Sequence, residues 1–263
     1  MSVGFECENY DFQYRDGIIN SELLWESHCH ARYEMISVLE GDVTIMLEGR
    51  DYRLTAKQTA ILPPLVYHTV RANKKGRYSR VTVLFDIEAV SEVLRERFEK
   101  RKKEAVIFYS HGTEELKKLC LSGDHGYYLP LAKALMTVFF YEYANTKGTG
   151  ASANVNEDLR EMLEYIDEHL CERITLEDIA LHTARSRSSV SHLFAEKMGI
   201  TPKQYILQKK MALASKLIGA GTPPTVAAAR IGYDNYSDFY RIYRKQTGRS
   251  PSEALSSSAL SET

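Results

Sequence analysis

The chain has 263 residues, of which 44% are hydrophobic and 26% are charged, and its formal net charge is −1. This length suits two domains, each large enough for a core of its own. No apolar run reaches the about 18 residues of a membrane-spanning helix, and the first residues lack the pattern of a secretory signal. The four cysteines stand apart without CxxC spacing, which is typical of reduced thiols. We therefore expect a cytoplasmic protein without disulfides and without contact to a membrane.

Short strands with regular turns dominate the first third of the sequence. Residues 35–40 and 43–47 have strand composition, and the turn residues Glu-Gly-Arg-Asp at 48–51 follow them as a hairpin signal. Residues 59–62 and 80–85 supply further strands. This pattern predicts a small antiparallel β-barrel or jelly roll.

Three histidines and one glutamate fall within this region. His28, His30 and Glu34 have the spacing HxHxxxE, and His68 ends the later segment PPLVYH. Because alternate residues of a strand share a face, we expect His28 and His30 to point the same way, with Glu34 and His68 joining them. Three imidazoles and a carboxylate suit zinc, nickel, manganese or iron.

This spacing resembles the two metal-binding motifs of cupins, although the glycines and the asparagine that accompany those motifs are replaced here. Three interpretations stay open: a divalent metal site, the polar lining of a pocket for a small ligand, or packing inherited from the barrel. For the second interpretation we expect the aromatic residues Trp25, Tyr33 and Tyr67 to line the same pocket as the four polar residues.

Helical spacing follows the strands. Residues 87–105, 115–121 and 127–144 fit helices, and the last of them is densely apolar and aromatic. These helices serve either as a dimer face or as packing against the barrel. Residues 146–156 are small and polar without periodicity, which predicts a flexible linker.

The same helix-turn-helix pattern occurs twice between residues 175 and 251. Each copy has a short helix, a tight turn and a second helix that ends in Gly-x-[Ser/Thr]-Pro. Apolar anchors four residues apart fix the inner face of each second helix, with Val190 and Phe194 in the first copy and Phe239 and Tyr243 in the second. Residues 203–219 form the joining helix. The outer face of each second helix is then free to enter a major groove.

Charge is concentrated in the same region. Residues 184–252 contain twelve Lys or Arg against three Asp or Glu, a net of +9. Residues 157–183 contain nine acidic and two basic residues, a net of −7. A basic block on periodic helices favours contact with DNA phosphates.

The inner anchors predict which side chains face DNA. Outward positions near the start of each second helix are expected to contact bases, Arg241 above all, and flanking basic residues are expected to contact phosphates. The predicted base contacts are Arg187, Ser188, Ser191 and His192 in the first copy and Asn235, Tyr236, Ser237, Tyr240 and Arg241 in the second, and the predicted phosphate contacts are Lys209, Lys210, Lys245 and Arg249.

The last hundred residues resemble the DNA-binding domain of AraC/XylS-type transcription regulators, most specifically in GYDNYSDFYRIYRKQTGRSPSEA at 232–254. The resemblance implies an α+β chain of two domains. A cupin-like sensor would occupy residues 1–145, the linker 146–156, and an all-α DNA-binding domain 157–258. The implied partners are double-stranded DNA, RNA polymerase, a small-molecule effector such as a sugar, and a second copy of the chain, with activation as the commoner outcome.

Two other functions are compatible with the same residues. One is a metal-dependent cupin enzyme fused to a DNA-binding domain, and the other is a regulator whose barrel only dimerises the chain. The lack of a further acid or base beyond the four candidate ligands argues against catalysis. We therefore expect a regulator rather than an enzyme, and a divalent metal in the barrel is the one cofactor that the pattern suggests.

Overall fold

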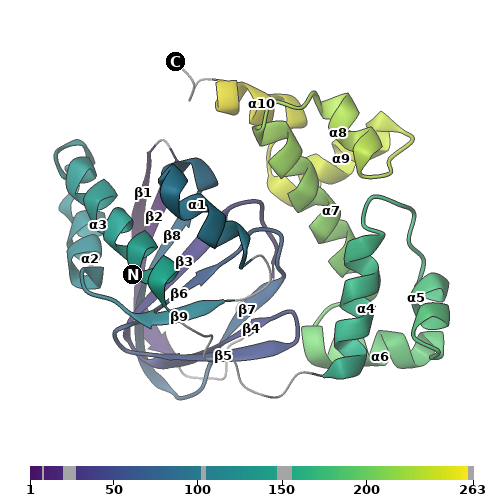
Figure 1. Ribbon diagram of the computed structural model, residues 1–263, viewed down its shortest axis with the longest axis horizontal. Helices are drawn as coiled ribbons and strands as arrows, with labels where there is room; N and C mark the ends of the chain where they lie inside the picture. The colour runs from purple at the N-terminus through teal and green to yellow at the C-terminus, as the bar shows by residue number, and fades with distance from the viewer. Residues whose placement is uncertain (8, 20–27, 102–104, 147–155, 260–263) are drawn as a thin grey trace. The chain divides into compact units, whose positions relative to one another are not determined.

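The computed structural model describes residues 1–7, 9–19, 28–101, 105–146 and 156–259 (Figure 1). Contacts between Cα atoms divide the chain into two compact units. The first comprises residues 1–26, 32–64 and 68–154, and the second comprises 155–263 with the short segments 27–31 and 65–67. No helix among the described residues is long and apolar enough to cross a membrane.

Two antiparallel sheets form the first unit, and their inner faces are buried against each other (Figure 1). The larger sheet has the order β1 (Ser2–Cys7), β2 (Tyr10–Ile19), β8 (Gly76–Phe85), β3 (Tyr33–Glu40), β6 (Gln58–Leu62) and β9 (Val106–Tyr109). The smaller sheet has the order β5 (Arg50–Thr55), β4 (Asp42–Leu47) and β7 (His68–Ala72). The predicted antiparallel β fold is confirmed, and β1, β2 and β9 are strands beyond those that the sequence indicated.

The hairpin between β4 and β5 shows why the turn signal was informative. Leu47 pairs directly with Arg50, so only Glu48 and Gly49 form the loop. Both have positive φ, 43° and 78°. A two-residue hairpin loop with positive φ at both positions matches the right-handed twist of the flanking strands.

Helices α1 (Glu92–Glu99), α2 (Thr113–Ser122) and α3 (His125–Asn145) cover the outer face of the larger sheet (Figure 1). Aromatic residues from α1 and α3, among them Phe98, Phe139 and Phe140, pack there against alternate residues of the strands. The predicted helix at 87–105 is instead a 3-10 turn η1 (Ile87–Ala89) followed by α1. Val90 between them is extended, which ends the first turn.

Residues 156–259 of the second unit form helices joined by short turns. Its elements are α4 (Glu157–Glu168), α5 (Leu176–His182), α6 (Arg187–Met198), α7 (Pro202–Gly219), α8 (Pro224–Arg230), α9 (Tyr236–Thr247) and α10 (Pro251–Ala259). The first half of α7 shares a core with α4, α5 and α6, and the second half shares another with α8 and α9. The two predicted helix-turn-helix units are therefore confirmed as two small cores on one common helix.

The repeated Gly-x-[Ser/Thr]-Pro sequence stops one helix and starts the next. Gly199 and Gly248 end α6 and α9 in the left-handed region, with φ of 69° and 77°. Thr201 then caps α7 in a capping box with Gln204, and proline occupies the first turn, where no backbone N–H is needed. The linker expected at 146–156 lies almost wholly outside the described residues, which resume at 156.

Candidate functional site

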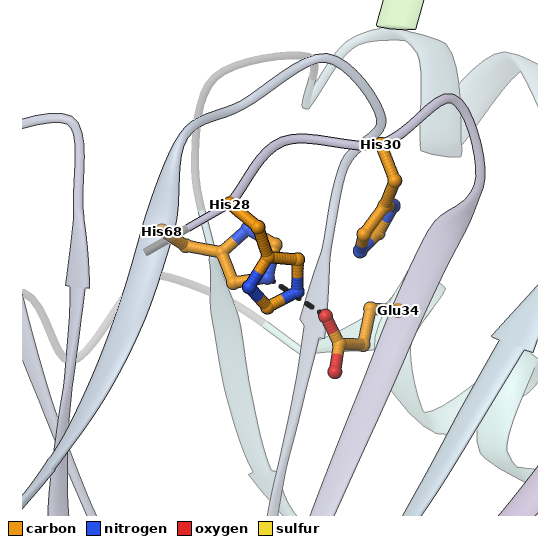
Figure 2. A group of neighbouring side chains, drawn as sticks. All are labelled: His28, His30, Glu34 and His68. Carbon is orange, nitrogen blue, oxygen red and sulfur yellow. Dashed lines mark hydrogen bonds and ion pairs between the residues drawn. The ribbon is translucent and has the colours of Figure 1, made fainter. Parts of the chain in front are cut away.

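The four predicted metal ligands come together at one point in the structure (Figure 2). Glu34 is the second residue of β3 in the larger sheet, and His68 is the first residue of β7 in the smaller sheet. His28 and His30 lie in the segment before β3 rather than on a regular strand, and their ring centroids are 5.5 Å apart. One ligand atom from each of the four residues lies within 4.8 Å of the others.

A buried hydrogen-bonded pair, Glu34 and His68, forms the inner half of this cluster. Nε2 of His68 lies 2.8 Å from Oε2 of Glu34, and their side chains are 1% and 8% exposed. His30 is half-buried and His28 is exposed, so the cluster is closed on the side of the sheets and open on the side of the two N-terminal histidines.

The donor set fits a divalent ion. Metal–nitrogen and metal–oxygen bonds of about 2.0–2.2 Å place the ligand atoms of one ion at most about 4.3 Å apart. The observed limit of 4.8 Å exceeds this value, so the four side chains would have to move closer together to bind one ion. Three imidazoles with one carboxylate suit zinc, nickel, manganese or iron, as expected from their chemistry.

Of the three aromatic residues expected beside this cluster, Tyr33 lies elsewhere and Trp25 is not described. Trp25 lies outside the described residues. Tyr33 precedes Glu34 on β3 and therefore faces the opposite side of the sheet, where its ring stacks on Phe85 at 5.3 Å and meets Phe98 edge-on at 5.5 Å. This burial raises the pKa of Tyr33 to about 12. Tyr67 is buried, with 2% exposure.

The inner face of β8 adds a basic residue that sequence reasoning missed. Val81 and Val83 face the helices, so Arg80 and Thr82 face the smaller sheet, on the same side as Glu34. Arg80 is only 7% exposed, and its Nη1 donates to the hydroxyl of Tyr78 at 3.4 Å. The sequence contained a signal for the burial of Arg80, because the alternation of side chains along residues 78–85 places this arginine on a buried face.

In the second unit, α6 presents the expected outward face. Val190, Phe194 and Met198 are buried. Arg187, Ser188 and His192 are exposed and Ser191 is half-buried, so all four predicted positions reach the surface. Nε of Arg187 lies 3.2 Å from Oε2 of Glu177, and this ion pair is exposed.

Helix α9 repeats this arrangement with one difference. Phe239 and Tyr243 are buried, while Ser237 and Arg241 are exposed and Tyr236 and Tyr240 are half-buried. The side chain of Asn235 accepts hydrogen bonds from the N–H groups of Ser237 and Asp238. Asn235 is thus the N-cap of α9, and its side-chain oxygen is occupied by the helix.

Lys209 and Lys210, expected to contact phosphates, are buried and bound within the protein. Nζ of Lys209 lies 2.5 Å from Oδ1 of Asp167, at the end of α4. Nζ of Lys210 donates to the carbonyl oxygens of Glu172 and Ile231 at 2.7 and 2.8 Å. Burial lowers the pKa of Lys210. Both lysines lie on the inner side of α7, where they connect it to neighbouring segments. The predicted phosphate contacts that remain exposed are Lys245 and Arg249.

Two helix-turn-helix units on a common helix, in one chain with a β domain that encloses a polar cluster, define a DNA-binding regulator with a ligand-binding domain. A family model described as an AraC-like ligand-binding domain matches residues 20–123, and a model described as a helix-turn-helix domain matches residues 179–257. The chain belongs to the AraC family of transcription regulators, and the resemblance noted in the sequence is confirmed.

Individual relatives agree with this family. The arabinose operon regulatory protein of Escherichia coli is 32% identical over 97 residues, which are 36% of this chain and 33% of that protein. The probable transcriptional regulator LumQ of Photobacterium leiognathi is 34% identical over 88 residues, 33% of this chain and 36% of that protein. The chain thus matches about a third of the length of these two. The uncharacterized regulator YobQ of Bacillus subtilis is 24% identical over 235 residues, 87% of this chain and 88% of that protein.

Proposed function

We propose that the chain binds promoter DNA through α6 and α9 and regulates transcription in response to a small ligand in its β domain. The observation that carries this proposal is that α6 and α9, which belong to the two cores on the common helix α7, each have an exposed face. Helix α7 has 18 residues and is about 27 Å long, which is comparable to the ~34 Å between successive major-groove segments on one side of DNA.

DNA binding is tested with the full chain and duplexes selected from a random pool. Fluorescence anisotropy at several salt concentrations would measure affinity for the selected duplexes and for scrambled ones. We expect selected sites to bind more tightly by about 10³-fold or more, with affinity falling steeply as salt rises. Equal affinity for selected and scrambled DNA would contradict sequence-specific regulation.

We propose further that the effector is a sugar and that the chain activates transcription through RNA polymerase. Two relatives support this choice by their names, the arabinose operon regulatory protein and the lactose operon transcription activator of Staphylococcus xylosus. Ligand binding in the β domain would act as a population shift that favours one placement of the DNA-binding units. A thermal-shift screen with sugars tests this, and a midpoint unchanged by every sugar would exclude this class of effector.

We also propose that His28, His30, Glu34 and His68 hold a divalent metal ion in the β domain. When bound, such an ion supplies positive charge and coordination of oxygen donors at the open side of the cluster. The buried Glu34–His68 pair positions two of the four ligands in advance.

The metal is tested by elemental mass spectrometry on protein purified without an affinity tag. We expect near-stoichiometric metal in the native chain and its loss in the double variant His28→Ala/His30→Ala. His111→Ala is the matched control, because His111 is an exposed histidine of the same unit outside the cluster. Native protein without metal after incubation with zinc, nickel, manganese or iron would leave the four residues as ligand or packing residues.

Finally, we propose that the chain functions as a homodimer, so that two pairs of recognition helices bind two DNA sites. Dimerisation would multiply the affinity for paired sites without any new contact to DNA.

A further inference from the structure

Two arginines lie directly opposite each other on one face of the larger sheet. Arg15 of β2 is paired with Arg80 of β8. Tyr14 and Val81 belong to the core beneath the helices, so alternation along both strands places the two arginines on the other face of the sheet. Directly paired side chains have Cβ atoms about 4.5–5.5 Å apart, and like charges at such positions destabilise a sheet. An anion that contacts both guanidinium groups would remove this cost.

Uncharged polar side chains continue this face of the sheet. Gln13 is paired with Thr82, one same-face position along both strands from the arginines. Nη2 of Arg15 donates to Oε1 of Gln13 at 3.3 Å, as Nη1 of Arg80 does to the hydroxyl of Tyr78 at 3.4 Å. Oγ1 of Thr82 is buried and has no hydrogen-bond partner among the described residues. We define Gln13, Arg15, Tyr78, Arg80 and Thr82 as the arginine wall.

The arginine wall borders open space. Burial raises the pKa of Tyr78, and the positive charges of Arg80 and Arg15 oppose this rise, so both guanidinium groups lie near its hydroxyl. Gly17 is paired with Tyr78, and a Cβ atom added at Gly17 would meet nothing within 4 Å. An open hollow of about 440 Å³ lies against β1 and β2, and Gln13 and Arg15 are among the residues that line it. Arg15 therefore connects the buried Arg80 to a hollow that is open to solvent.

We propose that the arginine wall binds the carboxylate of the effector, so that the effector is a sugar acid and not a neutral sugar. A guanidinium group binds a carboxylate through two parallel N–H···O bonds, and the carboxylate between Arg15 and Arg80 removes the repulsion between them. The hydroxyl of Thr82 and the amide of Gln13 are suited to the hydroxyl groups of the sugar. The proposal rests on the proposed binding of a small ligand in the β domain and specifies the chemical class of that ligand.

The distribution of charge on this face favours a carboxylate over a phosphate ester. Asp11 of β2 and Glu34 of β3 are both paired with Leu84, which lies four residues, or about 13 Å, along β8 from Arg80. Glu6 of β1 is paired with Asp11 and adds to this acidic end. The face is therefore positive at one end and acidic at the other. A sugar acid has one anionic end and several hydroxyl groups, whereas a phosphate ester has a second negative charge that the acidic end repels.

Isothermal titration calorimetry with the full chain tests the class of effector. The probes are matched pairs in which a carboxylate replaces the terminal hydroxymethyl group, namely galacturonate with galactose, glucuronate with glucose, and mannuronate with mannose. Galactose 6-phosphate is the dianionic probe. We expect at least one of the acids to bind about 30-fold or more tightly than its neutral partner, because hydrogen bonds to charged groups are the stronger ones. We expect galactose 6-phosphate to bind more weakly than galacturonate.

Substitutions of the two arginines test the position of the carboxylate. Arg15→Met and Arg80→Met should each lower the affinity for the acid that binds by about 10-fold or more and change the affinity for its neutral partner little. Arg80→Lys should retain part of the affinity, because lysine keeps the charge but not the paired donors. Arg71→Met is the matched control and should leave the affinity unchanged. Arg71 is paired with Thr44 on the face of the smaller sheet that lies away from the buried Val70.

Circular dichroism and the thermal midpoint without ligand report the folding of each variant. Arg15 is exposed, so Arg15→Met keeps the test decisive even where loss of the buried Arg80 destabilises the protein.

Four results would overturn the proposal. Equal affinity for an acid and its neutral partner would contradict the anionic class but uphold a sugar in the β domain. Acid binding that both Arg→Met variants leave unchanged would place the carboxylate elsewhere. Tighter binding of galactose 6-phosphate than of galacturonate would indicate a phosphate ester. Failure of every acid to bind would exclude a sugar acid. Binding to selected DNA is measured separately, so none of these results counts against sequence-specific DNA binding.

Discussion

Arg241 offers the sharpest test of DNA recognition at the scale of a single residue. Its side chain is 76% exposed and its ion pair with Asp238, at 3.3 Å, is also exposed, so little holds it away from DNA. Replacing Arg241 with Ala should weaken binding to the preferred site by about 1–3 kcal/mol and relax the preference at one base position. Anisotropy titrations with single-base variants of a selected site measure both effects.

Lys245→Ala is the companion variant for this prediction. Lys245 is exposed in the last turn of the same helix, and we expect its loss to weaken binding to all sequences alike and to reduce the salt slope by about one. If Arg241→Ala behaves in the same uniform way, Arg241 contacts only phosphate.

Lys210 illustrates the opposite case, a basic residue that supports the fold. Its ammonium group satisfies the carbonyl oxygens of Glu172 and Ile231, and Lys210→Met would leave both without this donor. We expect the free energy of unfolding to fall by roughly 1–3 kcal/mol, because the buried carbonyl of Ile231 would lose its partner. Urea denaturation measures this change. Lys203→Ala, at an exposed position of the same helix, should change stability by less than about 0.5 kcal/mol.

The salt dependence of DNA binding separates the two roles of Lys210. If Lys210 only supports the fold, Lys210→Met and the native chain should show the same salt dependence of DNA binding under conditions in which the variant is folded. Unchanged stability together with a smaller slope would instead return Lys210 to the phosphate contacts expected from its position in the sequence.

The residues that sequence reasoning placed well are those whose neighbours lie nearby in the chain. Anchors four residues apart define the inner face of α6 and α9, so Arg187 and Arg241 follow as outward positions. The burial of Lys209 and Lys210 depends on α4 and α8, which contact α7 from elsewhere in the sequence. Tyr33 was placed beside Glu34 although strict alternation on a strand separates neighbours to opposite faces.

At the scale of secondary-structure elements, hydrogen bonds to Asp42 connect the strands of the smaller sheet. Its carboxylate accepts two hydrogen bonds from Arg53 of β5, at 2.9 and 2.6 Å, and one from Asn73, directly after β7, at 2.8 Å. Arg53 is the main cause that lowers the pKa of Asp42 to about 2. The three strands of this sheet are therefore connected through one ionised group.

This connection predicts how stability depends on pH. An aspartate has a pKa of about 3.9 when unfolded, so a folded value of about 2 stabilises the protein above pH ~4, and this contribution is lost as the pH falls toward 2. Asp42→Asn should therefore lower the free energy of unfolding near neutral pH, with a difference from the native chain that shrinks between pH 4 and 2. Urea denaturation across this range measures the difference. A difference that stays constant down to pH 2 would show that ionisation of Asp42 is not the cause.

Element boundaries were predictable where a chemical stop signal is present. The Gly-x-[Ser/Thr]-Pro sequence marks the ends of α6 and α9 because glycine adopts positive φ and proline starts the next helix. No such signal separates η1, α1 and β9, and helical spacing across residues 87–105 was therefore extended too far. Residues 10–15 of β2 alternate between aromatic and polar side chains, a strand signal that the sequence reasoning did not use, and the strand pairs with β8.

At the scale of the whole molecule, sequence reasoning gave the family and the two kinds of domain, but it could not choose between a dimer face and packing for the helices after the strands. Helix α3 packs against the strands through its buried face, which includes Phe139 and Phe140. The exposed apolar residues of α3 became evident only from the exposure of each residue in the structure. Composition alone did not separate the faces, because both are apolar.

If exposed residues of α3 join two copies in the proposed homodimer, they should determine how the protein binds paired DNA sites. The native dimer carries two pairs of recognition helices, so a duplex with two selected sites at a suitable spacing should bind at least about 100-fold more tightly than a duplex with one. The variant Ala134→Lys/Val138→Lys, which places two charges on the exposed face of α3, should lose this gain. Each of its DNA-binding units is unaltered, so its affinity for a single site should equal that of a native monomer unit.

Electrophoretic mobility shifts with one-site and two-site duplexes, at a fixed salt concentration, measure this gain directly. The variant Val93→Glu is the decisive control, because Val93 is 86% exposed on α1 of the same unit and its substitution is expected to keep the dimer. It should therefore retain the gain that Ala134→Lys/Val138→Lys loses. A monomeric variant that still binds paired sites with the full gain would mean that cooperation arises on the DNA and not through α3, and the role of the first unit would then be confined to binding its ligand.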